Sequence, residues 1–128
     1  MKDTTKEKLA SLEQDISEKK GEFSLFGLFL REGAQDKWDI LAAAPWLSAD
    51  IKQGLKYLTD QILSRLDAEE LLSISRIVIL ENGDPTLEAI HKAIQVKHGK
   101  VEVSNSNFSG VEITHACIST SSVIPTSG

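Results

Sequence analysis

An apolar segment, FSLFGLFLR from Phe23 to Arg31, constrains the fold more than any other part of the chain. Successive side chains of a strand point to opposite faces of its sheet, and both sets of alternating positions in this segment are apolar. Phe23, Leu25 and Phe29 are expected to share one face. A strand that is apolar on both faces is typical of the interior of a layered sheet and not of a solvated edge. We therefore expect this segment to be an inner strand.

Helical and extended patterns follow one another along the rest of the chain and predict its fold class. Apolar residues at helical spacing predict helices, whereas alternating or continuous apolar runs predict strands. In chain order we expect a helix at 4–20, strands at 23–31 and 38–44, a helix at 48–66, a helical turn at 67–72, a strand at 77–80, a helix at 84–94 and two strands between 100 and 120. This α-β-β-α-(α)-β-α-β-β order indicates an α+β domain, in which helices pack on one mixed sheet of about five strands.

The connections between the strands predict their directions and the extent of the domain. The first two and the last two strands are joined by short loops, so each pair is expected to form an antiparallel hairpin. The crossover through the 48–66 helix should set the third strand parallel to the second. Residues 1–120 are expected to form a single domain. The segment SSVIPTSG, residues 121–128, is expected to be a flexible tail.

Charge and cysteine content limit the partners and the compartment of the protein. The 128 residues carry a formal net charge of −5, and an acidic protein repels phosphate backbones and anionic membranes. Nucleic-acid and membrane partners are therefore disfavoured. The single cysteine, Cys117, excludes a disulfide within the chain and is typical of a reducing compartment. No secretory signal begins the chain, so we expect a soluble cytoplasmic protein.

The segment SRIVILENGDPTLEAIHKAI, from Ser75 to Ile94, places an apolar strand directly before a helix. Phosphate-binding proteins often place their chemistry at such a junction. This one has a single glycine and no Lys-Ser/Thr pair, so it matches neither common nucleotide-binding motif. Asp84 has the position of an N-cap and Pro85 that of the first helical residue. We interpret the junction as a structural corner.

The histidines and the cysteine are too dispersed to indicate a metal site. His91, His98, His115 and Cys117 form no HxH, HxxxH or CxxC pattern, and we expect neither a metal nor another cofactor. His115 and Cys117 should share a strand face with Ile113, but side chains at this spacing stand about 7 Å apart, too far for a direct hydrogen bond.

Asp39 is the remaining candidate for chemistry, and its neighbours suggest a structural position. Asp36 and Lys37 precede it, so we interpret it as the solvated end of a strand. An enzyme remains the alternative: a hydrolase-like site would have to be assembled in three dimensions from Asp39, His91, His115 and Cys117.

Lysines near the KHGK turn form the only local basic cluster that the sequence suggests. Lys92, Lys97, His98 and Lys100 lie in or near this turn, without interleaved aromatic residues. Such a cluster is usually a solvated loop. The functional alternative is a weak contact with a phosphate or an acidic partner.

Two aromatic residues are the candidate partner contacts. Trp46 follows Pro45 in an expected loop, and Phe108 lies in SNSNFSG, which is expected to join the last two strands. Aromatic side chains on loops recur as interface anchors. Most of the chain's informative features are apolar and no polar cluster indicates an active site, so we expect a protein-interaction or regulatory module without one.

The last strand predicts how the protein could associate with itself. VEITHACIST, residues 111–120, is β-prone and has a single charge, Glu112, with no proline. Edge strands are normally guarded by charges, prolines or bulges, so an edge at this segment would invite pairing. Together with the narrow Leu9, Leu12 and Ile16 stripe of the first helix, it predicts a two-fold symmetric homodimer.

Overall fold

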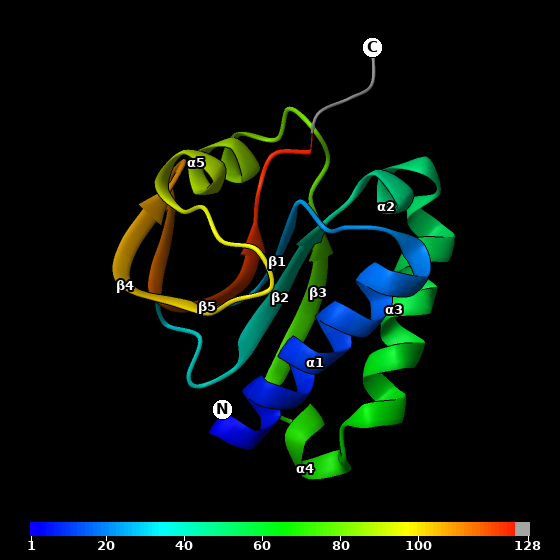
Figure 1. Ribbon diagram of the computed structural model, residues 1–128. Coiled ribbons are helices and arrows are strands. Elements are labelled where there is room, and N and C mark those ends of the chain that lie inside the picture. The colour runs from blue at the N-terminus through cyan, green and yellow to red at the C-terminus, as the bar shows by residue number, and fades with distance from the viewer. Residues whose placement is uncertain (125–128) are drawn as a thin grey trace.

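A single five-stranded sheet organises the computed structural model, which describes residues 1–124 (Figure 1). The strands lie side by side in the order β3-β2-β1-β5-β4. All neighbours are antiparallel except β2 and β3, which are parallel. This confirms the predicted α+β class and the mixed sheet. The strands are β1 (Leu25–Arg31), β2 (Trp38–Ala43), β3 (Ile74–Ile79), β4 (Val101–Phe108) and β5 (Val111–Ser121).

The helices cover the two faces of this sheet unequally. Buried side chains of α1 and α3 pack on one face, called here the α1 face, and those of α5 pack on the opposite α5 face. In Figure 1, α1 and α3 lie next to each other, whereas α5 lies beside the β4–β5 hairpin. The helices are α1 (Asp3–Lys20), α2 (Pro45–Ala49), α3 (Ile51–Arg65), α4 (Ala68–Leu71) and α5 (Pro85–Ala93).

The inner position of β1 confirms the interpretation of the apolar segment. Leu25 and Phe29 belong to the cluster under α5, whereas Phe26 belongs to the cluster under α1 and α3. Phe23 was placed on the wrong face, because it precedes the first strand residue and does not follow the strand alternation. Its ring packs against Phe26 at a centroid distance of 5.1 Å, within the α1-face cluster.

The C-terminal hairpin differs most from the expectation. One strand of the C-terminal pair lies at an edge, as expected, but β5 pairs with β1 on one side and with β4 on the other, so residues 111–120 are not that edge. β4 forms that edge instead, and the polar SNSN stretch that was expected to be a loop is part of it. The reason is that β5 carries buried residues on both faces, including Cys117 and Ile118, whereas β4 has mostly polar side chains.

A register shift in the β1–β5 pairing changes which way the β5 side chains point. Leu30 pairs with His115 but Arg31 pairs with Ile113, so Thr114 is an extra residue on β5. Ile113 consequently packs on the α5 face and His115 lies on the α1 face. The expectation that these two residues share a face is wrong because such a bulge reverses the alternation.

The two helices after β2 begin at different residues from those expected. Pro45 does not open a loop but is the first residue of α2, and Asp50, not Ser48, caps α3 through a bond from the Gln53 amide. At the strand-to-helix corner the expected helix cap is confirmed. The Asp84 side chain accepts from the amides of Thr86 and Leu87, and Pro85 begins α5.

The end of the chain is held to the sheet through Ser122. β5 extends to Ser121, one residue beyond the expected domain boundary, and the amide of Ser122 donates to the carbonyl of Ser24. The expected flexible tail continues to residue 128, but residues 125–128 lie outside the described part. No helix within residues 1–124 combines the length and the apolar character that crossing a membrane requires.

Candidate functional site

The free edge of β3 lies beside an open apolar groove. The groove has a volume of about 370 Å³ and runs between α3 and β3. Leu55 and Leu63 of α3 form one wall, and Ile74 and Ile77 of β3 form the other. Leu63 is 54% exposed although it is a large apolar side chain. The α3 helix therefore buries only part of its apolar surface in this chain.

The α3 sequence explains why the groove stays open. Leu58 and Ile62 reach the core below α1, and Gly54 allows close contact with Leu47 of α2. Ile51 and Leu55 lie at helical spacing with Leu58 and Ile62, but both are more than one third exposed. The apolar periodicity of this helix therefore overestimates the surface that it buries.

β3 lacks most of the devices that protect an exposed edge. Its sequence, ISRIVI, contains no proline and a single charged residue, Arg76. The opposite edge strand, β4, carries a charge and a run of serine and asparagine side chains. Charges, prolines and bulges are the usual protection against an added strand. β3 also has an extra residue, Ser75, where its pairing with β2 shifts register. The feature that distinguishes the β3 edge from the β4 edge in the described chain is therefore the apolar groove beside it.

A cluster of three charges spans the strands next to this edge. Asp39 of β2 is buried, with its side chain 2% exposed, and its Oδ2 atom contacts the Nε atoms of Arg31 at 2.6 Å and of Arg76 at 3.3 Å. Arg76 is the direct neighbour of Asp39 in the parallel pairing. The Oδ1 atom of Asp39 is also buried and has no hydrogen-bond partner among the described residues.

The buried position of Asp39 corrects its interpretation as a solvated strand end. Two guanidinium groups fold over its carboxylate, and a buried carboxylate requires such partners. The signal in the sequence was the position of Asp39 between Trp38 and Ile40 of an inner strand. The two arginines could not be assigned to it without the strand order, because they are eight and thirty-seven residues away.

A large cavity lies at the other end of the sheet, beside His91. It measures about 890 Å³ and is lined by Ser24, Pro45, Leu87 and His91, among others. The Nε2 atom of His91 lies 2.8 Å from the carbonyl oxygen of Ser24. Because a carbonyl oxygen only accepts, Nε2 of His91 carries the proton that it donates.

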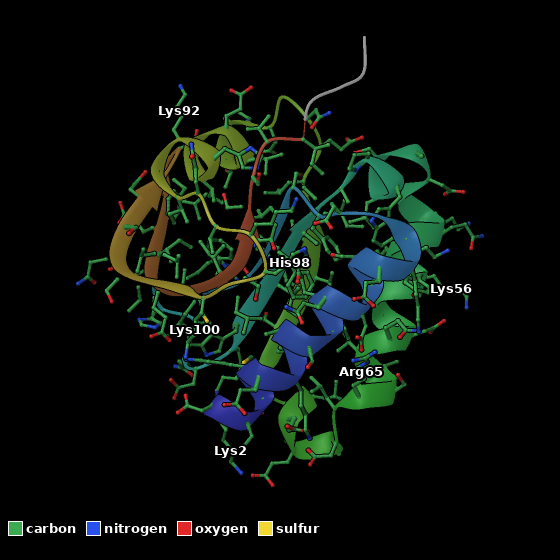
Figure 2. The ribbon with its side chains drawn as sticks, in the orientation of Figure 1. Lys2, Lys56, Arg65, Lys92, His98 and Lys100 are labelled. Atoms are coloured by element: carbon green, nitrogen blue, oxygen red, sulfur yellow. The ribbon has the colours of Figure 1, made fainter. Side chains whose placement is uncertain are left out.

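His98 is half-buried, and its ring is held by two carboxylates instead of being free in a solvated basic loop. Its Nδ1 atom is 2.9 Å from Oε2 of Glu13, a fully buried carboxylate, and its Nε2 atom is 2.9 Å from Oε2 of Glu22. The hydrogen bond with Glu13 raises the pKa of His98, and both carboxylates add to this effect while partial burial opposes it. In Figure 2, Lys92 lies well away from His98 and Lys100. His98 is thus paired with acidic side chains and does not add a free positive charge to the expected cluster.

His115 and Cys117 occupy the α1 face of β5. The His115 ring meets Trp38 edge to face at 5.7 Å, and its Nδ1 atom lies 3.3 Å from Ser104 Oγ. Cys117 is buried, and burial raises the pKa of its thiol. These side chains lie on the opposite face of the sheet from Asp39.

The four residues of the enzyme alternative do not form one site. Asp39 is held by two arginines on the α5 face, His91 lines the cavity beside α5, and His115 and Cys117 lie on the α1 face. No group of three or more His, Cys, Asp or Glu side chains within residues 1–124 is arranged to hold a metal ion.

Trp46 and Phe108, the expected partner contacts, have different positions. Trp46 is half-buried in α2, where its indole N–H donates to the carbonyl of Gly21 and its ring packs between Phe23 and Tyr57. Its placement in a loop is therefore wrong. Phe108 is not in a loop either, because it ends β4 and is 4% exposed. Its ring packs at 6.2 Å from Phe29, which leaves it inaccessible to a partner in this structure.

Comparisons with known proteins add no relative to this description. The chain matches no protein-family model, no curated protein and no solved structure with which it was compared. Its function is therefore inferred from the geometry described above.

Proposed function

We propose that the protein is an interaction module that binds an extended segment of another protein as an additional strand along β3. The observation that carries the proposal is the coincidence of a weakly protected strand edge with an open apolar groove. In β-strand addition, main-chain hydrogen bonds provide affinity and side-chain pockets provide specificity. Both elements are present along β3.

The alternation of β3 divides the added strand into two sets of side chains. Ile77 and Ile79 pack with the α1-face cluster, and Ile77 lines the groove. Val78 packs on the α5 face, and Arg76 borders the groove while its Nε atom contacts Asp39. A bound strand has the same period of two. Its apolar side chains would enter the groove beside Leu63, and its other side chains would meet Arg76.

Charge favours a segment of another protein over a second copy of this chain. A two-fold axis between two β3 edges pairs the strands antiparallel, with equivalent faces on the same side. Two registers of this antiparallel pairing include most of β3. In one register the two Arg76 side chains lie directly opposite each other, and in the other they lie diagonally across from each other. Like charges at such positions destabilise a sheet, whereas an acidic partner segment does not meet this repulsion.

Selection of peptides tests this proposal directly. A random peptide library displayed on phage would be selected for binding to the wild type. The selected peptides would then be tested against the Leu63→Lys variant, which places a charge in the groove. Leu72→Lys is the matched control, because Leu72 is also an exposed leucine but does not line the groove. We expect β-prone peptides whose binding is lost in Leu63→Lys and kept in Leu72→Lys. Failure to enrich any Leu63-dependent peptide would contradict the proposal.

Self-association is the competing use of the same edge. The homodimer predicted from the sequence cannot form through residues 111–120, because they are not an edge. The β3 edge is the alternative surface through which two copies would pair. Sedimentation velocity at micromolar concentration distinguishes between a second copy of this chain and another protein as the occupant of the β3 edge. A dimer that dissociates in Leu63→Lys but not in Leu72→Lys would make a second copy the occupant and overturn the choice of another protein.

A second candidate function, binding of a small organic ligand, is favoured by the cavity beside His91. Its volume of about 890 Å³ is in the range of small-molecule pockets, and the hydrogen bond to Ser24 fixes the imidazole. Nuclear magnetic resonance with a fragment library tests this. Fragments that shift the amide signals of Leu87 and His91 in the wild type, but not in His91→Phe, would support a ligand site; the absence of such fragments would contradict it.

A further inference from the structure

We infer that Arg31 and Arg76 together form a binding site for a carboxylate side chain of the added strand. This inference rests on the proposed function and specifies the chemistry of the partner. The cluster holds two guanidinium groups but one carboxylate, Asp39, so it has a formal net charge of +1. No second carboxylate forms an ion pair with either arginine among residues 1–124.

The exposed parts of the two arginines are available to a ligand. Their side chains are 40% and 55% exposed, and the contacts with Asp39 use the Nε atoms. The terminal Nη atoms of Arg31 and Arg76 make no hydrogen bond to another described residue. A guanidinium group offers a planar fork of N–H donors that matches a carboxylate. Each arginine therefore retains donors that can face an incoming acid.

Asp39 acts as the positioning residue of this site. Its carboxylate is buried between β1 and β3 and contacts both Nε atoms through the same oxygen, Oδ2. Long arginine side chains lose rotamer freedom when they bind a ligand, and a fixed contact at Nε removes part of this cost beforehand. Asp39 thereby holds the two guanidinium groups near each other, although their positive charges repel.

The position of Arg76 selects the residue of the partner that meets the site. Arg76 belongs to β3 itself, so the residue opposite it on an added strand lies on the same face at about 5 Å between Cβ atoms. The neighbours of that residue point to the groove beside Leu63 and Ile77. The partner segment therefore has an acidic residue flanked by apolar residues. A nucleic acid fits less well, because the chain has a net charge of −5 and a polyanion meets this field at every phosphate.

A set of three labelled peptides tests the inference. The peptides have an extended sequence of alternating valine and threonine with one central position that is glutamate, glutamine or lysine. Fluorescence polarisation measures their binding to the wild type. We expect the glutamate peptide to bind about fivefold more tightly than the glutamine peptide, the size of an exposed ion pair, and the lysine peptide to bind most weakly. Added salt should reduce this difference.

Arginine variants identify the site in the same assay. Arg31→Gln and Arg76→Gln should each remove most of the preference for glutamate, and Arg76→Glu should reverse it in favour of lysine. Arg65→Gln is the control, because Arg65 is a partly exposed arginine of α3 that pairs with Asp15 and lies outside the cluster (Figure 2). It should leave the preference unchanged. Circular dichroism of each variant verifies that the fold is retained.

The outcomes separate this inference from the proposed function. If all three peptides bind equally and lose binding in Leu63→Lys, the strand-addition function is supported and the carboxylate site is wrong. If the preference for glutamate persists in both arginine variants, the acid is recognised elsewhere and the inference is also wrong. If no peptide binds and phage selection yields none that depends on Leu63, both proposals fail.

Discussion

The half-buried imidazole of His98 and the buried carboxylate of Glu13 meet at 2.9 Å, although they are 85 positions apart in the sequence. Glu13 is fully buried, and its second oxygen accepts a hydrogen bond of 2.6 Å from the Thr120 hydroxyl. Unpaired buried charges are strongly destabilising. This contact therefore joins α1, β5 and the turn before β4 through one carboxylate.

The stability of the protein should fall as the pH rises above the ordinary His98 pKa of about 6.5 because of this contact. The folded pKa of His98 is raised above its ordinary value of about 6.5, so the folded state retains a proton that the unfolded state loses. The stabilisation is complete below the unfolded pKa and disappears as the pH passes the folded pKa. Urea unfolding across this range measures the loss.

A substitution of His98 separates this effect from other titrations. His98 has a φ of 50°, and asparagine tolerates this conformation better than most residues. His98→Asn should lower the free energy of unfolding by about 2 kcal/mol at pH 6, an amount reduced by the partial exposure of the ring. The difference from the wild type should shrink at higher pH. An equal difference at pH 6 and pH 9 would show that protonation of His98 is not involved.

Asp84→Ala should destabilise the fold by about 1 kcal/mol, the usual effect of removing an N-cap. The Asp84 side chain accepts from the Thr86 amide at 2.8 Å, and this partner is lost in the variant. Asp60→Ala is the comparison, because Asp60 is an exposed aspartate that pairs only with Lys56 on α3, and it should change stability by less than about 0.5 kcal/mol. If Asp84→Ala instead leaves the melting temperature unchanged but alters binding of inorganic phosphate, the corner is a binding site.

Local features of this fold were predictable, because neighbouring residues determine them. The capping by Asp84, the apolar β1 strand and the parallel crossover to β3 depend on residues close in sequence or on general connection rules. The order of the C-terminal strands was not predicted. The low charge of residues 111–120 was interpreted as an unprotected edge, although apolar residues on both faces of a strand also indicate an inner position. β5 satisfies this second criterion, as β1 does.

The candidate site was less accessible to sequence reasoning than the fold. Asp39 and Arg76 are direct neighbours only because β2 and β3 pair in parallel with a particular register. The exposure of Leu63 depends on which side of α3 meets the sheet, and the periodicity of its apolar residues does not determine this. Such contacts between distant segments require the arrangement of the elements, whereas caps and turns do not.

The purified protein should contain no stoichiometric zinc or iron. His91, His98 and His115 each have a different set of partners: the Ser24 carbonyl, the Glu13 carboxylate and the Trp38 ring. Metal sites require several ligands directed at one point. Elemental analysis after dialysis measures the content. About one metal per chain that is lost in His91→Ala or His115→Ala would contradict this prediction and favour an enzyme.

Phe108→Ala should be strongly destabilising, which distinguishes a core residue from an exposed contact. The Phe108 ring is buried against Phe29 in the cluster under α5, and removal of a buried phenylalanine usually costs about 3 to 5 kcal/mol. Because β4 is an edge strand that can relax around the cavity, we expect about 3 kcal/mol. Val123→Ala is the control, since Val123 is 68% exposed, and it should change stability by less than about 0.5 kcal/mol. Urea unfolding monitored by circular dichroism compares the variants. A Phe108→Ala protein with the stability of the wild type would place this ring at the surface and restore it as a candidate partner contact.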